Sequence, residues 1–254
     1  MIDEPTPGAP QRRLIRILTY NVHSCRGTDG KVDPARIAAV IASCKADIVA
    51  LQEVDVRRAR SGGVDQAERI ASHLGMASHF HPALHLEEEQ YGDAILTALP
   101  AELVKAAPLP SIGEPRGAIW LSVDLGGVNL QVINTHLGLR RRERLTQAAT
   151  LLGPEWVGAM EDRHAPAVLL GDFNATPYSA PYRALSAHGQ DVQLANGGRA
   201  RATFPSRFPF LRLDHIFAGQ GVETVHAEVR SDALARRASD HLPLLAEIAV
   251  MVPA

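Results

Sequence analysis

Short apolar runs that end in a polar residue recur along this chain, and they predict buried β-strands. Such strands are usually about four to eight residues long and rich in branched apolar side chains. We expect strands over residues 16–21, 46–54, 94–99, 118–125, 128–135, 167–170, 213–217, 222–229 and 242–250.

Apolar residues at helical spacing lie between these runs and predict helices. One helix starts at Asp33-Pro34, where a capping residue precedes a proline in the first helical position. Further helices are expected over residues 65–74, 142–152 and 182–188. Because a Gly126-Gly127 turn joins two of the strands as a hairpin, the pattern indicates a layered α/β domain rather than a parallel βαβ array.

The N-terminal segment differs from the rest of the chain. Residues 1–13 are polar and rich in proline, and we expect a flexible leader followed by one domain over residues 14–254. No run resembles a signal peptide or approaches the ~20 apolar residues of a membrane span, so we expect a cytoplasmic protein. In that compartment Cys25 and Cys44 are expected to stay reduced.

Overall charge bears on the partners of the protein. The chain has 254 residues and a formal net charge of -2. Proteins that grip nucleic acid usually carry a basic excess, since phosphate contacts dominate that affinity. Nucleic acid is therefore possible but not favoured as a partner, and a monomer is the default.

Polar residues that could perform chemistry stand where the apolar runs stop. They are Asn21, Glu53, His136, Asp172, Asn174, Asp214, Asp240 and His241. Magnesium prefers oxygen ligands and is typically held by one or two carboxylates together with substrate phosphate. Glu53 is the best ligand candidate, and Asn21 could bind the ion or orient Glu53.

Hydrolysis of a phosphate ester also needs an oriented water, a proton acceptor and hydrogen-bond donors. Asp172 and His241 can handle the water and its protons, and Asp214 is the natural partner of His241. Asn174 and His136 can donate hydrogen bonds to phosphoryl oxygens. A histidine paired with a carboxylate keeps one tautomer and a raised basicity.

Seven short motifs contain these residues and span residues 14 to 250. They are Thr19-Tyr20-Asn21-Val22-His23, Leu51-Gln52-Glu53-Val54, Tyr91-Gly92-Asp93-Ala94-Ile95-Leu96, Asn134-Thr135-His136-Leu137, Gly171-Asp172-Phe173-Asn174, Leu213-Asp214-His215-Ile216 and Ser239-Asp240-His241-Leu242-Pro243. In this order they resemble the endonuclease/exonuclease/phosphatase superfamily of DNase I-like, metal-dependent phosphoesterases, in particular its compact bacterial members.

The resemblance implies an α/β fold with four layers, in which two mixed β-sheets pack face to face between helices. The site would lie at one rim of this sandwich and use one or two Mg²⁺ ions, with Mn²⁺ as a substitute. Glu53 would bind the metal with Asn21 nearby, and Asp240 would lie beside the metal or bind a second ion. Whether Asp172 or His241 is the general base stays open.

Further positions are candidates for substrate binding. Relatives often direct an arginine from the position of Arg116 toward the substrate, and Tyr91 belongs to one of the motifs. Asp93 replaces the asparagine of many relatives and could instead pair with His136. Arg57 begins a loop, residues 57–63, that could clamp an anion or simply be solvated.

Two other segments are noted without an assigned role. Arg140, Arg141, Arg142 and Arg144 form a charge run that is expected to be a solvated helix face. Phe204, Phe208 and Phe210 could form a rim for a lipid or a base, but we expect them to cover an edge of the core.

Three functions are compatible with the sequence. The favoured one is hydrolysis of a phosphodiester or phosphomonoester on a small molecule or lipid. The alternative is a DNA endonuclease or exonuclease, and a non-catalytic binding protein of the same fold is disfavoured by the complete set of catalytic residue types. Fold alone does not determine the substrate.

Overall fold

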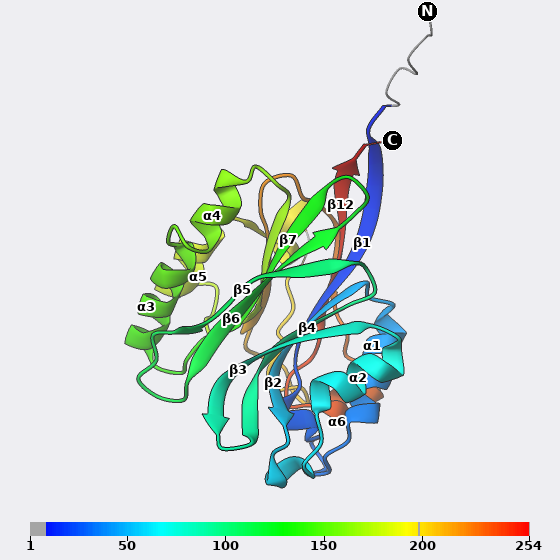
Figure 1. The fold of residues 1–254 in the computed structure, drawn as a ribbon, viewed down its shortest axis with the longest axis vertical. Coiled ribbons are helices and arrows are strands. Elements are labelled where there is room, and N and C mark those ends of the chain that lie inside the picture. Colours follow the sequence, from blue (N-terminus) through cyan, green and yellow to red (C-terminus); the bar gives the residue numbers. More distant parts are fainter. Residues whose placement is uncertain (1–8, 198, 254) are drawn as a thin grey trace, which may run out of the picture.

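Two six-stranded mixed β-sheets packed face to face form the centre of the molecule, with helices on both outer faces (Figure 1). The structure is a computed structural model that describes residues 9–197 and 199–253. This four-layer arrangement confirms the expected fold.

The first sheet contains both ends of the described chain. Its strands run in the order β11 (Glu223–Val229), β12 (Leu244–Val252), β1 (Gln11–Asn21), β2 (Ile48–Val56), β4 (Glu89–Thr97) and β3 (Ala77–Leu86). Its outer face is covered by α1 (Pro34–Cys44), α2 (Gln66–Leu74) and α6 (Ala233–Ala238). The side chains of Asp33 and Asp65 cap α1 and α2 at their N-termini.

The second sheet contains the middle of the chain. Its strands run in the order β5 (Ala101–Leu109), β6 (Arg116–Asp124), β7 (Asn129–His136), β8 (Ala167–Asp172), β10 (Asp214–Ala218) and β9 (Gln190–Asp191). Its outer face is covered by α3 (Arg141–Leu152), α4 (Val157–Asp162) and α5 (Ala180–Ser186). Short 3₁₀ turns lie at His23–Cys25, Ala59–Ser61 and Val192–Gly197.

Strand pairing brings the polar strand ends to one rim of the sandwich. β1 and β2 are parallel, with Asn21 opposite Gln52. β7 and β8 are also parallel, with His136 opposite Asp172, and antiparallel β10 starts with Asp214 opposite the same aspartate. Carboxyl ends of parallel strands meet at a common edge, so the register itself gathers the candidate residues.

Gly171 makes the close approach of β7 and β8 possible just before Asp172. Its φ is +147°, and a Cβ built there would lie 1.9 Å from the carbonyl oxygen of Thr135. A side chain at this position would push the two strands apart, so glycine is required where the register sets Asp172 beside His136.

Two apolar cores hold the layers together. The larger one lies between the sheets and against α1, α2 and α6, and includes Ile17, Leu51 and Ile95. The smaller one packs the second sheet against α3, α4 and α5 around Trp120 and Trp156. None of the helices in the described part of the chain is long and apolar enough to cross a membrane.

The structure corrects the expected leader and adds strands that were not expected. Strand β1 starts at Gln11, so residues 11–13 belong to the sheet and not to the expected leader, whose residues 1–8 lie outside the described residues. The polar side chains of residues 11–13 do not show the apolar pattern of a strand. This end of β1 faces solvent, where Arg12 pairs with Glu223. Strands β3 and β5 were not expected, since their half-buried sequences alternate weakly.

Candidate active site

A cleft of about 440 Å³ opens at the rim where these strands end. The residues expected from the sequence that line it are Glu53, Tyr91, Arg116, His136, Asp172, Asn174, Asp240 and His241. Asn21, Asp93 and Asp214 are buried directly behind the cleft rather than on its wall. Segments more than 200 residues apart thus contribute to one site.

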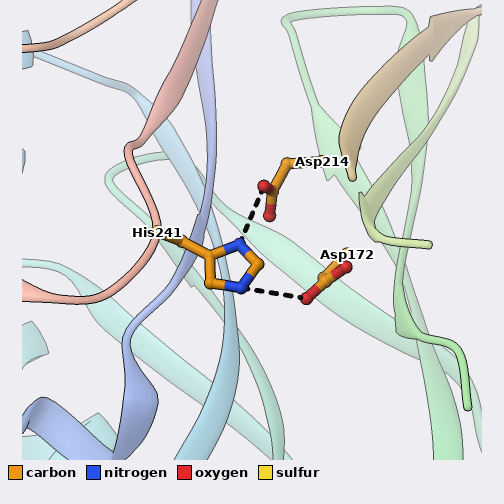
Figure 2. A group of neighbouring side chains, drawn as sticks. All are labelled: Asp172, Asp214 and His241. Atoms are coloured by element: carbon orange, nitrogen blue, oxygen red, sulfur yellow. Dashed lines mark hydrogen bonds and ion pairs between the residues drawn. The ribbon is translucent and has the colours of Figure 1, made fainter. Parts of the chain in front are cut away.

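His241 lies between two aspartates, as Figure 2 shows. Its Nδ1 is 2.9 Å from Oδ2 of Asp214, and its Nε2 is 3.7 Å from Oδ2 of Asp172. The three residues come from the loop before β12, the start of β10 and the end of β8. Asp214 therefore fixes the imidazole so that Nε2 points toward the cleft.

The charges of this group shift the pKa values of its members. Burial disfavours the charged imidazole, but Asp214 and then Asp172 outweigh burial and raise the pKa of His241 to about 10. Burial and Asp214 together raise the pKa of Asp172 to about 7, against the opposing effect of His241. Both shifts favour a cationic His241 ring beside a carboxyl group of Asp172 that is protonated more readily than usual.

Glu53 occupies a β-bulge in β2. Between the pairs Leu51–Ala94 and Val54–Gly92 the register shifts, so that Gln52 and Glu53 together face one residue of β4. Glu53 has a φ of +59°, a left-handed conformation that is strained for a non-glycine residue. The bulge turns its carboxylate into the cleft, and such strain is common at functional sites.

Asn21 joins Glu53 to Asp172. Its Nδ2 donates hydrogen bonds of 3.0 Å to Oε1 of Glu53 and 2.9 Å to Oδ2 of Asp172. Its Oδ1 accepts a hydrogen bond from the backbone N–H of His23. The amide of Asn21 thus bridges the two carboxylates and is itself held by the backbone of His23.

Asn174 and His136 form a second hydrogen-bonded pair at the cleft. Nδ2 of Asn174 lies 3.1 Å from Nε2 of His136 and 2.9 Å from the carbonyl oxygen of Leu137. Burial holds the pKa of His136 well below its usual value, with Arg116 and His241 acting in the same direction. A neutral His136 that accepts at Nε2 leaves the amide nitrogen of Asn174 no free hydrogen for a phosphoryl oxygen.

Oxygen atoms suited to a divalent cation are present in the cleft. Among the described residues, no hydrogen bond uses Oε2 of Glu53, and the carboxylate of Asp240 is partly exposed nearby on the cleft wall. Asp172, Asp214 and His241 also lie close enough together to share an ion. Magnesium prefers oxygen ligands to an imidazole nitrogen, however, so the oxygens around Glu53 fit this ion better.

Arg116 lies at the cleft wall above Asp93. The guanidinium pairs with Glu114 and is almost fully buried. Burial raises the pKa of Asp93 to about 8, although the charge of Arg116 opposes that shift. Among the described residues no ion pair joins Asp93 to His136, whose Nε2 lies 3.5 Å from Oδ2 of Asp172 instead.

The loop of residues 57–63 is held by acidic residues. Arg57 pairs with Glu88 at 3.0 Å and does not line the cleft. Arg60 does line it, and its guanidinium makes hydrogen bonds of 2.7 and 2.8 Å to the buried Asp55. Arg60, not Arg57, therefore supplies the loop's cation at the site.

Several cleft residues were not singled out from the sequence. They are Ser24, Arg26, Glu114 and Leu139, whereas Arg60 belongs to the basic loop that the sequence already placed beside the metal. Phe204 was expected at a core edge, but its ring lies 4.8 Å from that of His241 and lines the cleft. Phe208 and Phe210 are exposed, so the expectation that they cover the core is wrong.

Comparison with known proteins agrees with this fold. The sequence model of the Endonuclease/Exonuclease/phosphatase family matches residues 18–241. The chain therefore belongs to this family, as the motifs predicted.

Individual relatives match over almost the whole chain. The uncharacterized protein YbhP of Escherichia coli strain K12 is 28% identical over 254 residues, which cover 95% of this chain and 99% of YbhP. A crystal structure of an endonuclease/exonuclease/phosphatase from Beutenbergia cavernae is 24% identical with a TM-score of 0.73, covering 94% of this chain and 72% of that one.

Two other solved structures share the fold. A mannosyl-6-phosphatase from Bacteroides thetaiotaomicron is 21% identical with a TM-score of 0.70, covering 92% of this chain and 99% of that one. The human Nocturnin catalytic domain, solved with a bound sulfate anion, is 20% identical with a TM-score of 0.69, covering 96% and 99%. At these identities the likeness shows the fold.

Proposed function

We propose that this protein is a magnesium-dependent phosphoesterase that hydrolyses a phosphodiester or phosphomonoester by in-line attack of water. The observation that carries the proposal is the position of His241 between Asp214 and Asp172, in the same cleft as the carboxylate of Glu53. Within one cleft, Glu53 would bind the cation, Asp172 would accept a proton, and His241 would be held as an imidazolium by Asp214.

Each residue has a defined part in this proposal. Glu53 would hold the ion with Asp240 beside it, and the ion would supply charge neutralisation at the phosphoryl oxygens. Asp172 would orient the attacking water and accept its proton, because its pKa of about 7 suits a general base near neutral pH. The cationic His241, held by Asp214, would stabilise the negative charge that develops on the phosphoryl group.

The remaining residues would hold the substrate. Arg116 and Tyr91 line the cleft and would contact the phosphate ester, with Asp93 fixing the arginine from behind. Asn174 would position His136, whose ring lies 3.5 Å from Asp172. Arg57 stays a weaker candidate, since it lies outside the cleft wall.

A small-molecule or lipid-linked phosphate is the favoured substrate. The net charge of -2 shows no overall basic excess of the kind that nucleic-acid-binding proteins usually carry. One solved structure of similar fold is a mannosyl-6-phosphatase, and another holds a sulfate anion, so the fold accommodates phosphomonoesters and tetrahedral oxyanions elsewhere. A DNA nuclease is the alternative.

A substrate panel tests the proposal. Bis-p-nitrophenyl phosphate, inositol phosphates, sphingomyelin and supercoiled plasmid are assayed with Mg²⁺, with Mn²⁺ and with EDTA. We expect metal-dependent hydrolysis that is lost in Glu53→Gln and kept in Glu88→Gln, which removes an exposed carboxylate outside the cleft. Hydrolysis that persists in EDTA would refute the proposal, and plasmid nicking as the main activity would favour the nuclease.

Three expectations stay predictions: cytoplasmic location, a monomeric state and the use of one or two ions. Sedimentation equilibrium and metal titration of the purified protein measure the last two directly.

A further inference from the structure

Large apolar side chains are exposed on four loops that surround the cleft. These rim loops are residues 110–115, 137–140, 173–179 and 204–211, and each adjoins a strand end or a residue of the cleft wall. Their exposed side chains are Ile112, Leu139, Tyr178, Phe208 and Phe210. The apolar character continues inward, since Leu139 and Phe204 line the cleft itself.

The loop of Phe208 and Phe210 is held in a defined shape, so their exposure is built into the fold. Phe210 donates a backbone hydrogen bond to Phe204, and Phe208 donates one to Pro205. Arg236 on α6 adds side-chain hydrogen bonds to the carbonyl oxygens of Ser206 and Arg207. The two phenylalanines are nevertheless 82% and 73% exposed. Holding two aromatic rings in water is unfavourable unless another surface covers them.

Positive charge accompanies these apolar side chains. Arg140, Arg141 and Arg142 follow Leu139 directly, and Arg207 precedes Phe208; all four are exposed. Within the described part of the chain none of them forms an ion pair, whereas Arg57, Arg58 and Arg60 are all paired. A chain with a net charge of -2 therefore presents unpaired arginines on the rim loops and on the adjoining start of α3.

We infer that the rim loops dock on a bilayer surface that carries anionic lipid. Aromatic and aliphatic tips can enter the boundary between headgroups and acyl chains, while guanidinium groups stay among anionic headgroups. Bases of a nucleic acid would stack on Phe208 and Phe210, but they would leave the aliphatic side chains of Ile112 and Leu139 exposed, whereas a lipid boundary can cover both kinds. The exposed apolar side chains of the rim loops lie around an open cleft and do not line one apolar groove. A deformable lipid surface can contact side chains that are arranged in this way.

The docking places the cleft opening against the membrane. It rests on the proposed function only in naming the substrate, which would be a phosphate ester carried on a lipid. Membrane binding itself does not depend on metal or on turnover, so the two proposals fail independently.

Vesicle sedimentation of the full-length protein tests the inference. Vesicles of phosphatidylcholine alone are compared with vesicles that also contain phosphatidylglycerol, in EDTA and in Mg²⁺. We expect binding to the anionic vesicles that is at least about tenfold stronger than to the neutral ones and that weakens with added salt. The double variant Phe208→Ser/Phe210→Ser should bind at least about tenfold more weakly.

A matched control comes from the opposite end of the sandwich. Leu14 and Met251 are 50% and 54% exposed on β1 and β12. Leu14 lies about 23 Å along the strand from Asn21. Leu14→Ser/Met251→Ser should bind vesicles like the unchanged protein, and both double variants should hydrolyse bis-p-nitrophenyl phosphate normally. The inference would be overturned if the protein did not bind vesicles, or if both double variants lost vesicle binding equally. Loss of hydrolysis with intact vesicle binding would affect only the proposed function.

Discussion

Gln52, on the sheet that carries Glu53, donates a hydrogen bond of 2.7 Å to the side-chain oxygen of Asn134 on the opposite sheet. The Nδ2 of Asn134 in turn donates to the carbonyl oxygens of Leu51 and Ala94, each at 2.9 Å. Leu51 and Ala94 are the last pair before the register of β2 and β4 shifts. A fully buried amide from one sheet thus secures the bulge that turns Glu53 into the cleft.

Replacing Asn134 with leucine should therefore weaken the metal site as well as the fold. The substitution leaves two backbone carbonyls and the amide of Gln52 without partners, which should lower the free energy of unfolding by about 2–5 kcal/mol. Because the bulge then loses its support, the Mg²⁺ concentration for half-maximal activity should rise about tenfold or more. Urea unfolding and Mg²⁺ titration of hydrolysis measure the two effects.

Gln131→Met on the same strand separates stability from metal binding. Gln131 hydrogen bonds Trp120 and Ser122 at the other end of β7, away from the cleft. This variant should unfold more easily without any change in its Mg²⁺ dependence. Equal Mg²⁺ dependence in both variants would show that Asn134 only stabilises the fold.

Asp214→Asn should reduce turnover without altering substrate affinity. Asp214 is fully buried and does not line the cleft, so it acts through the ring of His241 and through its charge on Asp172. We expect kcat to fall by about 10²–10⁴ with KM nearly constant, because the amide cannot hold the same charged tautomer. The pKa of His241, measured by NMR titration of the ring, should fall at the same time. An unchanged ring pKa would contradict the assigned role.

Asp172→Asn and Glu53→Gln should separate chemistry from metal binding. Asp172→Asn should lose turnover by about 10² or more while still binding Mn²⁺, since Glu53 remains. Glu53→Gln should lose Mn²⁺ binding itself. Titration by electron paramagnetic resonance distinguishes the two results, and full activity of Asp172→Asn would remove it from the proton transfer.

The sequence predicted the parts of this site that depend on strand ends. Asp172, Asp214 and His241 each follow or begin an apolar run, and parallel or antiparallel pairing is enough to bring such ends together. Asn21 and Glu53 were predicted for the same reason. Their exact contacts, such as the amide of Asn21 between two carboxylates, depend on the bulge, which the pattern did not indicate.

Other features depend on contacts between distant segments. The choice between Arg57 and Arg60 is made by acidic partners, Glu88 for the first and Asp55 for the second. Nothing in the local sequence pattern shows which of the two arginines in this loop lies at the cleft. Phe208 was expected to be buried because apolar residues usually are, and its exposure follows from how its loop is tied to α6.

Away from the cleft, the stability contributed by Asp191 should depend on pH. Burial opposes its charge, but His215, Arg212 and the hydroxyl of Tyr182 outweigh burial and lower its pKa to about 2. A lowered pKa in the folded state means that the contribution is complete above the unfolded value near 4 and is lost as the pH falls toward 2. Asp191→Asn should thus cost about 2–3 kcal/mol at pH 7 and clearly less at pH 3. Urea unfolding at both pH values, with the exposed Asp124→Asn as control, measures this; a cost that stays constant with pH would contradict it.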